Sequence, residues 1–208
     1  MMFTLQGAVD HLYQLAVVEN KGTSTQRLQV LADLCIQELD ARGVRGARCE
    51  VQVPGMGRPK QWDVAWEHGG RVRLGISLKS LLRNLLGSVP NRIDDLTGEM
   101  ANVQLWSPEI VTGYVMLLNI EDDSVRKTDG RTWSQFFSSV IDRLSGRRAP
   151  AWAPGMIEAS ALVRINFANG ATLVDPGQSL APFFDRLAQC VKERNPDALL
   201  LARVASTT

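Results

Sequence analysis

The run EIVTGYVMLLNI, residues 109–120, restricts the fold of this chain more than any other segment. It is apolar and β-branched, and after Glu109 it carries no charge. A strand with apolar side chains on both faces must be covered on both faces. The run therefore predicts a central buried strand in an α/β fold.

The segments around this run predict the rest of the sheet. HGG forms a glycine turn between two alternating segments and predicts a β-hairpin. Two adjacent hairpin strands and a later strand reached through a helix predict a mixed central sheet flanked by helices. Strands are expected at 47–53, 61–67, 71–80 and 109–120, with a strand or hairpin within 160–177; helices are expected at 4–19, 23–43, 91–106, 132–146 and 179–194.

Composition limits the domain number, the class of partner and the cellular compartment that can be expected. The 208 residues fit a single domain, 1–208, and the 23 basic and 22 acidic residues neither require nor exclude a nucleic-acid partner. The three cysteines show no CxxC spacing, which argues against a zinc ribbon or a disulfide framework and favours the cytoplasm. No apolar run approaches the roughly 20 residues of a membrane span, so no membrane association is expected.

Ser77 and Lys79 put polar groups on the face of the strand RLGISLKS opposite its apolar residues, two positions apart and so on the same side. Asp63 lies on the neighbouring strand, and alternation places it opposite Trp62, Val64 and Trp66. The strand register, which the sequence does not fix, decides whether Asp63 meets Ser77 and Lys79.

If Asp63 meets them, the site suits phosphodiester chemistry. The carboxylate of Asp63 and the carbonyl of Leu78 are oxygen ligands of the kind Mg²⁺ prefers. The ammonium of Lys79 can orient a water or stabilise charge that develops on a phosphate.

The order α-β-β-β-α-β over residues 23–120, with Asp63 on the second strand and Ser77-Leu78-Lys79 on the third, resembles the PD-(D/E)XK nuclease superfamily of restriction-endonuclease-like fold. The resemblance implies a Mg²⁺-dependent endonuclease that hydrolyses double-stranded DNA, such as a type II restriction endonuclease or a related defence nuclease. It also implies a homodimer, with residues 121–208 as a C-terminal extension for recognition or dimerisation.

Ser77 departs from the family motif, which has an acid at this position. Some restriction endonucleases with Ser-X-Lys take the missing acid from the following helix. Glu99 is the first choice here as catalytic and metal-binding acid, and Asp95 is the second. Arg92, on the same helix face, could contact a phosphate.

Further basic residues are candidate DNA contacts. Arg58 and Lys60 lie in or next to the loop between the first two strands, and Arg71 and Arg73 share the face of Ser77 and Lys79 by alternation. Arg143, Arg147 and Arg148 either suit a helix C-terminus or form a phosphate-binding patch.

Two other interpretations stay open. Loss of the motif acid at Ser77 would suit a catalytically inactive DNA-binding or assembly module of the same fold. Alternatively, Asp63 and Lys79 could form an ordinary cross-strand ion pair in an interaction protein.

Overall fold

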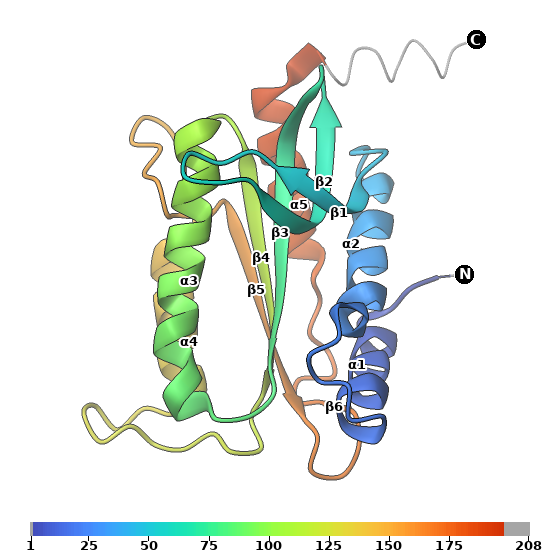
Figure 1. The fold of residues 1–208 in the computed structure, drawn as a ribbon, viewed down its shortest axis with the longest axis vertical. Helices are drawn as coiled ribbons and strands as arrows, with labels where there is room; N and C mark the ends of the chain where they lie inside the picture. The colour runs from blue at the N-terminus through green and yellow to red at the C-terminus, as the bar shows by residue number, and fades with distance from the viewer. Residues whose placement is uncertain (1, 198–208) are drawn as a thin grey trace.

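The computed structural model describes residues 2–197, which form a mixed sheet between two layers of helices (Figure 1). In these residues the sheet has six strands in the order β1-β2-β3-β4-β5-β6. The pairs β1–β2, β2–β3 and β5–β6 are antiparallel, whereas β3–β4 and β4–β5 are parallel. The predicted mixed sheet flanked by helices is confirmed. Its strands are β1 (Arg48–Val53), β2 (Lys60–His68), β3 (Arg71–Leu81), β4 (Val111–Asn119), β5 (Ala159–Asn166) and β6 (Thr172–Leu173).

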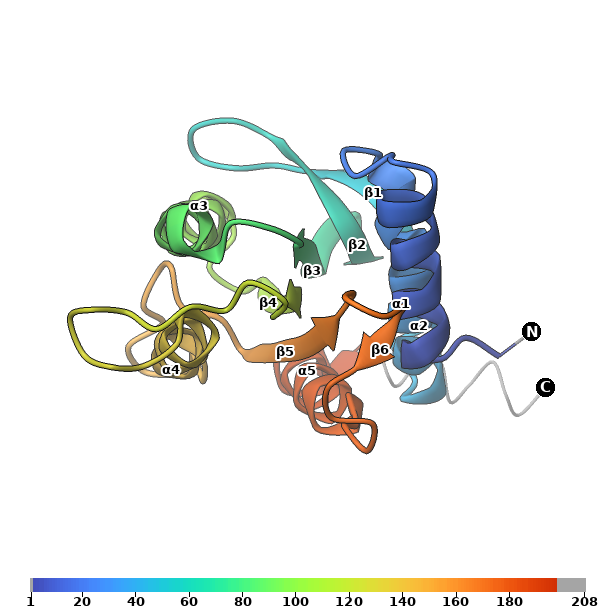
Figure 2. The same ribbon diagram turned by 90° about the horizontal axis from the view of Figure 1, so that it is seen from below.

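The run predicted as a central buried strand is β4, and all nine of its residues are buried. Helices cover both of its faces, as Figure 2 shows in the view from below. One layer contains α1, α2 and α5, and the other contains α3 and α4. Among residues 2–197, no helix combines the length and the hydrophobicity needed to cross a bilayer. The helices are α1 (Leu5–Tyr13), η1 (Gln14–Val18), η2 (Thr25–Leu28), α2 (Gln29–Ala41), α3 (Leu85–Trp106), α4 (Trp133–Leu144) and α5 (Ala181–Arg194).

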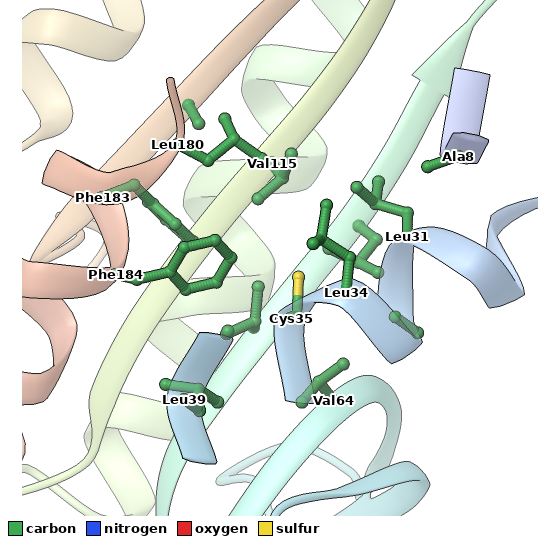
Figure 3. Close-up of a cluster of buried hydrophobic side chains, with 14 of the residues drawn as sticks. Ala8, Leu31, Leu34, Cys35, Leu39, Val64, Val115, Leu180, Phe183 and Phe184 are labelled. Carbon is green, nitrogen blue, oxygen red and sulfur yellow. The ribbon is translucent and has the colours of Figure 1, made fainter. Parts of the chain in front are cut away.

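The larger hydrophobic core lies between the sheet and the layer of α1, α2 and α5 (Figure 3). Cys35 of α2 is fully buried there, and burial raises the pKa of its thiol well above the usual range. Gly113 lets α5 approach β4, because a Cβ at this position would lie 2.9 Å from Phe183 and Leu187.

Residues 121–197 belong to the same sheet and core. They contribute β5, which pairs with β4, and α5, which packs on both strands. The remainder of the predicted extension, residues 198–208, lies outside the described residues.

The helix predicted to begin at about Asn91 begins at Leu85 instead. Asn84 caps it by accepting a hydrogen bond from the Gly87 amide at 3.2 Å. Pro90, directly before the predicted start, lies inside the helix. The carbonyl that would have bonded to the missing N–H belongs to Leu86, a residue on the exposed side of the helix.

The β1–β2 hairpin bends where Glu50 faces Asp63. Glu50 has a left-handed backbone with φ of 53°, which costs a non-glycine residue roughly 1–2 kcal/mol. Strand β2 continues beside β1 as far as Lys60, but its pairing with β3 reaches only Val64, opposite Ile76. The two strands of the sheet therefore diverge at Asp63.

The bend corrects one expectation about β2. Trp62 belongs to the core beneath α3 together with Ala65, whereas Val64 and Trp66 belong to the other core. Regular alternation would have placed Trp62 with Val64. It fails because the distorted backbone of the hairpin lies between these two residues.

Candidate active site

Asp63 lies at the point where β2 leaves β3. Its Oδ2 accepts a hydrogen bond from the backbone N–H of Leu78 at 2.7 Å. In a strand, the N–H and C=O of one residue point to the same side, so the Leu78 carbonyl also faces the side where β2 has left. The divergence thus places a carboxylate beside a stretch of β3 that is not paired with β2, at the buried residue Leu78.

Lys79 joins two acids that come from different elements. Its Nζ lies 3.6 Å from Asp63 Oδ2 and 3.9 Å from Glu99 Oε2. Ser77 Oγ donates to Glu99 Oε2 at 3.4 Å. The structure therefore brings together Asp63 of β2, Ser77 and Lys79 of β3, and Glu99 of α3.

Glu99 is the buried charged member of this group, and the neutral Ser77 is buried as well. The side chain of Glu99 is only 8% exposed, whereas those of Asp63 and Lys79 are 27% and 29% exposed. A second ammonium, that of Lys60, lies 3.9 Å from Glu99 Oε1. A buried carboxylate needs such partners, because desolvation of an unpaired charge is costly.

Asp95, the other acid considered from the sequence, is not part of the cluster. Its side chain is 62% exposed and pairs with Arg92 at 3.1 Å. One helical turn thus separates an outward-facing ion pair from the buried acid Glu99.

The donor set can be tested against Mg²⁺. Within residues 2–197, no three or more His, Cys, Asp or Glu side chains gather as a metal-binding group. The cluster offers the carboxylates of Asp63 and Glu99 and the carbonyl of Leu78. Mg²⁺ usually keeps several waters and takes one or two carboxylates together with substrate phosphates, so this set fits it.

Two residues at the site were missed from the sequence. Tyr114 of β4 lies beside Ser77 in the register, and burial is the main cause that raises the pKa of its phenol. It belongs to the apolar run, where nothing distinguishes it from a core residue.

Asn102 of α3 is the second. Its side chain accepts from the Gly57 amide at 2.8 Å and donates to the Arg58 carbonyl at 2.9 Å, which fixes the loop before Lys60. The glycines of the GMG segment were the available signal, because they allow a close backbone approach.

The predicted DNA contacts are distributed over the molecule. Arg58 is exposed, and Lys60 lies at Glu99 as described. Arg71 and Arg73 pair with Glu109 at 3.8 and 2.9 Å. They lie at the start of β3, with Arg73 about 20 Å along the strand from Lys79.

Arg147 is not available to a phosphate-binding patch. It is 1% exposed and forms an ion pair with Glu158 at 2.9 Å. The alternative that Arg143, Arg147 and Arg148 form one surface patch is therefore wrong for Arg147. The acid that holds it, Glu158, is buried just before β5, eleven residues along the chain, and the charge pattern within the basic cluster could not indicate this.

No family model matches this chain, and no curated protein matches its sequence.

Proposed function

We propose that this protein is a Mg²⁺-dependent endonuclease that hydrolyses phosphodiester bonds in double-stranded DNA. The observation that carries the proposal is the position of Lys79, whose ammonium lies within 4 Å of the carboxylates of both Asp63 and Glu99. These groups come from three separate elements, and the side chains of Asp63 and Lys79 are partly exposed to solvent.

The residues have distinct roles in this proposal. Asp63, Glu99 and the Leu78 carbonyl would hold the cation. Bound there, Mg²⁺ supplies charge stabilisation at the phosphate and a more acidic water. Lys79 orients the attacking water or stabilises the developing negative charge.

Ser77 and Lys60 support Glu99 from two sides. The hydroxyl of Ser77 donates to one carboxylate oxygen, and Lys60 lies near the other. Together they fix the direction of a carboxylate that replaces the acid absent at position 77.

The order of elements supports a restriction-endonuclease-like core. From α2 to β4 the chain runs α-β-β-β-α-β, which is the order that the motif residues imply. We extend the proposal to a cytoplasmic restriction or defence nuclease that acts as a homodimer, because two copies match the two-fold symmetry of duplex DNA.

A catalytically inactive DNA-binding or assembly module is the second candidate. It is favoured by Ser77 and by the presence of only two carboxylates in the cluster, Asp63 and Glu99. In such a module the contacts of Lys79 would serve only to neutralise these acids.

Cleavage of supercoiled plasmid in Mg²⁺ or Mn²⁺ tests the proposal. We expect Lys79→Ala and Glu99→Gln to lose about 10²–10³-fold in rate, as expected when a charge-stabilising group is removed. Asp95→Asn is the matched control, because this acid lies on the same helix outside the cluster, and it should cleave at nearly the wild-type rate. EDTA should abolish cleavage.

Two results would contradict parts of this proposal. If wild-type protein binds duplex DNA but cuts it with neither metal, the inactive module is the correct interpretation. If Asp95→Asn loses as much activity as Glu99→Gln, the assignment of Glu99 is wrong.

A further inference from the structure

A pocket of about 530 Å³ lies beside the candidate active site, and no residue of the cluster lines it. It lies between the α1–η2 segment, the end of β3, α3 and the ends of β4 and β5. Its lining includes Arg27, Ser80, Arg83, Arg92, Asn119 and Glu121.

The pocket is positively charged. Three arginines from separate segments, Arg27, Arg83 and Arg92, line it together with one acid, Glu121. Arg92 is also paired with Asp95 at 3.1 Å. Glu121 already accepts from the Asn119 amide at 3.4 Å. The pocket thus has an excess of cations over anions.

Arg27 is fixed at the wall of this pocket. Its Nε donates to Ser80 Oγ at 3.1 Å, and another guanidinium nitrogen donates to the Ser24 carbonyl at 3.0 Å. Burial and the nearby cation of Arg92 lower the pKa of Arg27, while Asp63 acts in the opposite sense. The pocket therefore holds two like charges close enough to influence each other.

Arg83 is the uncommitted cation. It is exposed, and within the described residues its side chain has no hydrogen bond or ion pair. An unpaired arginine beside a half-buried one makes a site for an anion with several acceptor oxygens, such as a phosphate.

The pocket is close to the candidate active site along both β3 and α3. Ser80 directly follows Lys79, and Arg92 precedes Glu99 by seven residues, about 10 Å along the helix axis. A separation of this size is within the span of a few phosphates of one DNA strand, which follow each other at about 3.4 Å along the duplex axis.

We propose that the pocket of Arg27, Arg83 and Arg92 binds a backbone phosphate of the same DNA strand, a few nucleotides from the phosphodiester at Lys79. The inference rests on the proposed function for its choice of ligand. It gives the protein a second phosphate contact on one side of the cleavage point, which positions the strand without reading its sequence.

The salt dependence of DNA binding tests this pocket. Binding of the full chain to a fluorescent 20-base-pair duplex is measured by anisotropy in EDTA over a series of NaCl concentrations. Loss of one phosphate contact should make the slope of log Kobs against log[salt] shallower by about 1. We expect this change for Arg83→Ala and for Arg92→Ala.

Arg45→Ala is the matched control. Arg45 is also exposed, and within the described residues its side chain has no ion pair or hydrogen bond. It follows α2, whereas Arg27 precedes that helix, so the two arginines lie at opposite ends of it. Its removal should leave the slope unchanged.

The outcomes separate the pocket from the proposed function, because binding is measured without metal. A shallower slope for Arg83→Ala in a protein that never cleaves plasmid supports the pocket and contradicts the nuclease. Active cleavage with the same slope for Arg83→Ala and Arg45→Ala overturns the pocket. Absence of duplex binding at 50 mM salt overturns it as well.

Discussion

Single residues at the candidate site show which sequence patterns correctly predict where a side chain lies in the structure. Lys79 and Ser77 share a face because strand alternation holds in the regular part of β3. Helical spacing offered both Asp95 and Glu99, and only the packing of α3 on the sheet selects Glu99 for the cluster. The side on which Trp62 packs was predicted wrongly, since one left-handed residue, Glu50, interrupts the hairpin.

Gly55 gives a stability prediction at this scale. A Cβ there would lie 2.1 Å from Asn102 Nδ2 and 2.5 Å from the Arg58 carbonyl. We expect Gly55→Ala to lower the free energy of unfolding by about 1–3 kcal/mol through this overlap. Urea denaturation measures it.

Gly57→Ala is the control in the same loop, because its Cβ would meet Asn102 at 3.4 Å, an ordinary contact. It should be close to wild type in stability. Equal losses for both alanines would show that the loop does not depend on its close contact with Asn102.

At the scale of elements, α3 links the fold to the site. It covers one face of the sheet, carries Glu99 inward, and anchors the loop before Lys60 through Asn102. The sequence located this helix but not its start, because Pro90 conceals the first turns. The strands were located to within a few residues, since alternation and glycine turns mark their limits.

Gly98 tests whether the low helix propensity of glycine at this position reduces the stability of the protein. It lies in the helix interior, and an added Cβ meets nothing within 4 Å. Gly98→Ala should therefore raise the free energy of unfolding by about 0.5–1 kcal/mol. A destabilised variant in chemical denaturation would mean that this helix face contacts something the added methyl group disturbs.

For the whole molecule, the arrangement of a sheet between two layers of helices followed from one segment, β4, whose apolar faces require cover on both sides. The strands that pair with β4 could not be predicted from this segment, because strand order depends on contacts between distant segments. One such contact is Glu158, which accepts from Arg147 at 2.9 Å and Arg194 at 2.7 Å and is fully shielded from solvent. It ties the connector after α4 and the last helix to the sheet.

Glu158→Gln should therefore destabilise the whole molecule. Removing one partner leaves the buried guanidinium of Arg147 without its counter-ion, a change that costs about 3–5 kcal/mol in comparable buried pairs. Asp175→Asn, which breaks the exposed pair with Arg164, should cost at most about 1 kcal/mol. Thermal unfolding of the two variants compares them, and similar melting temperatures would contradict the central role of Glu158.

The cluster around Lys79 also bears on how the chain reaches its native state. Two ammonium groups already balance the two acids, so the unliganded protein has no cluster of bare negative charge for a cation to neutralise. If the cluster binds Mg²⁺ as proposed, folding can precede metal loading. An entering ion would compete with the protein's own lysines, so its occupancy would depend on a polyanion that draws these lysines away as well as on the free ion concentration.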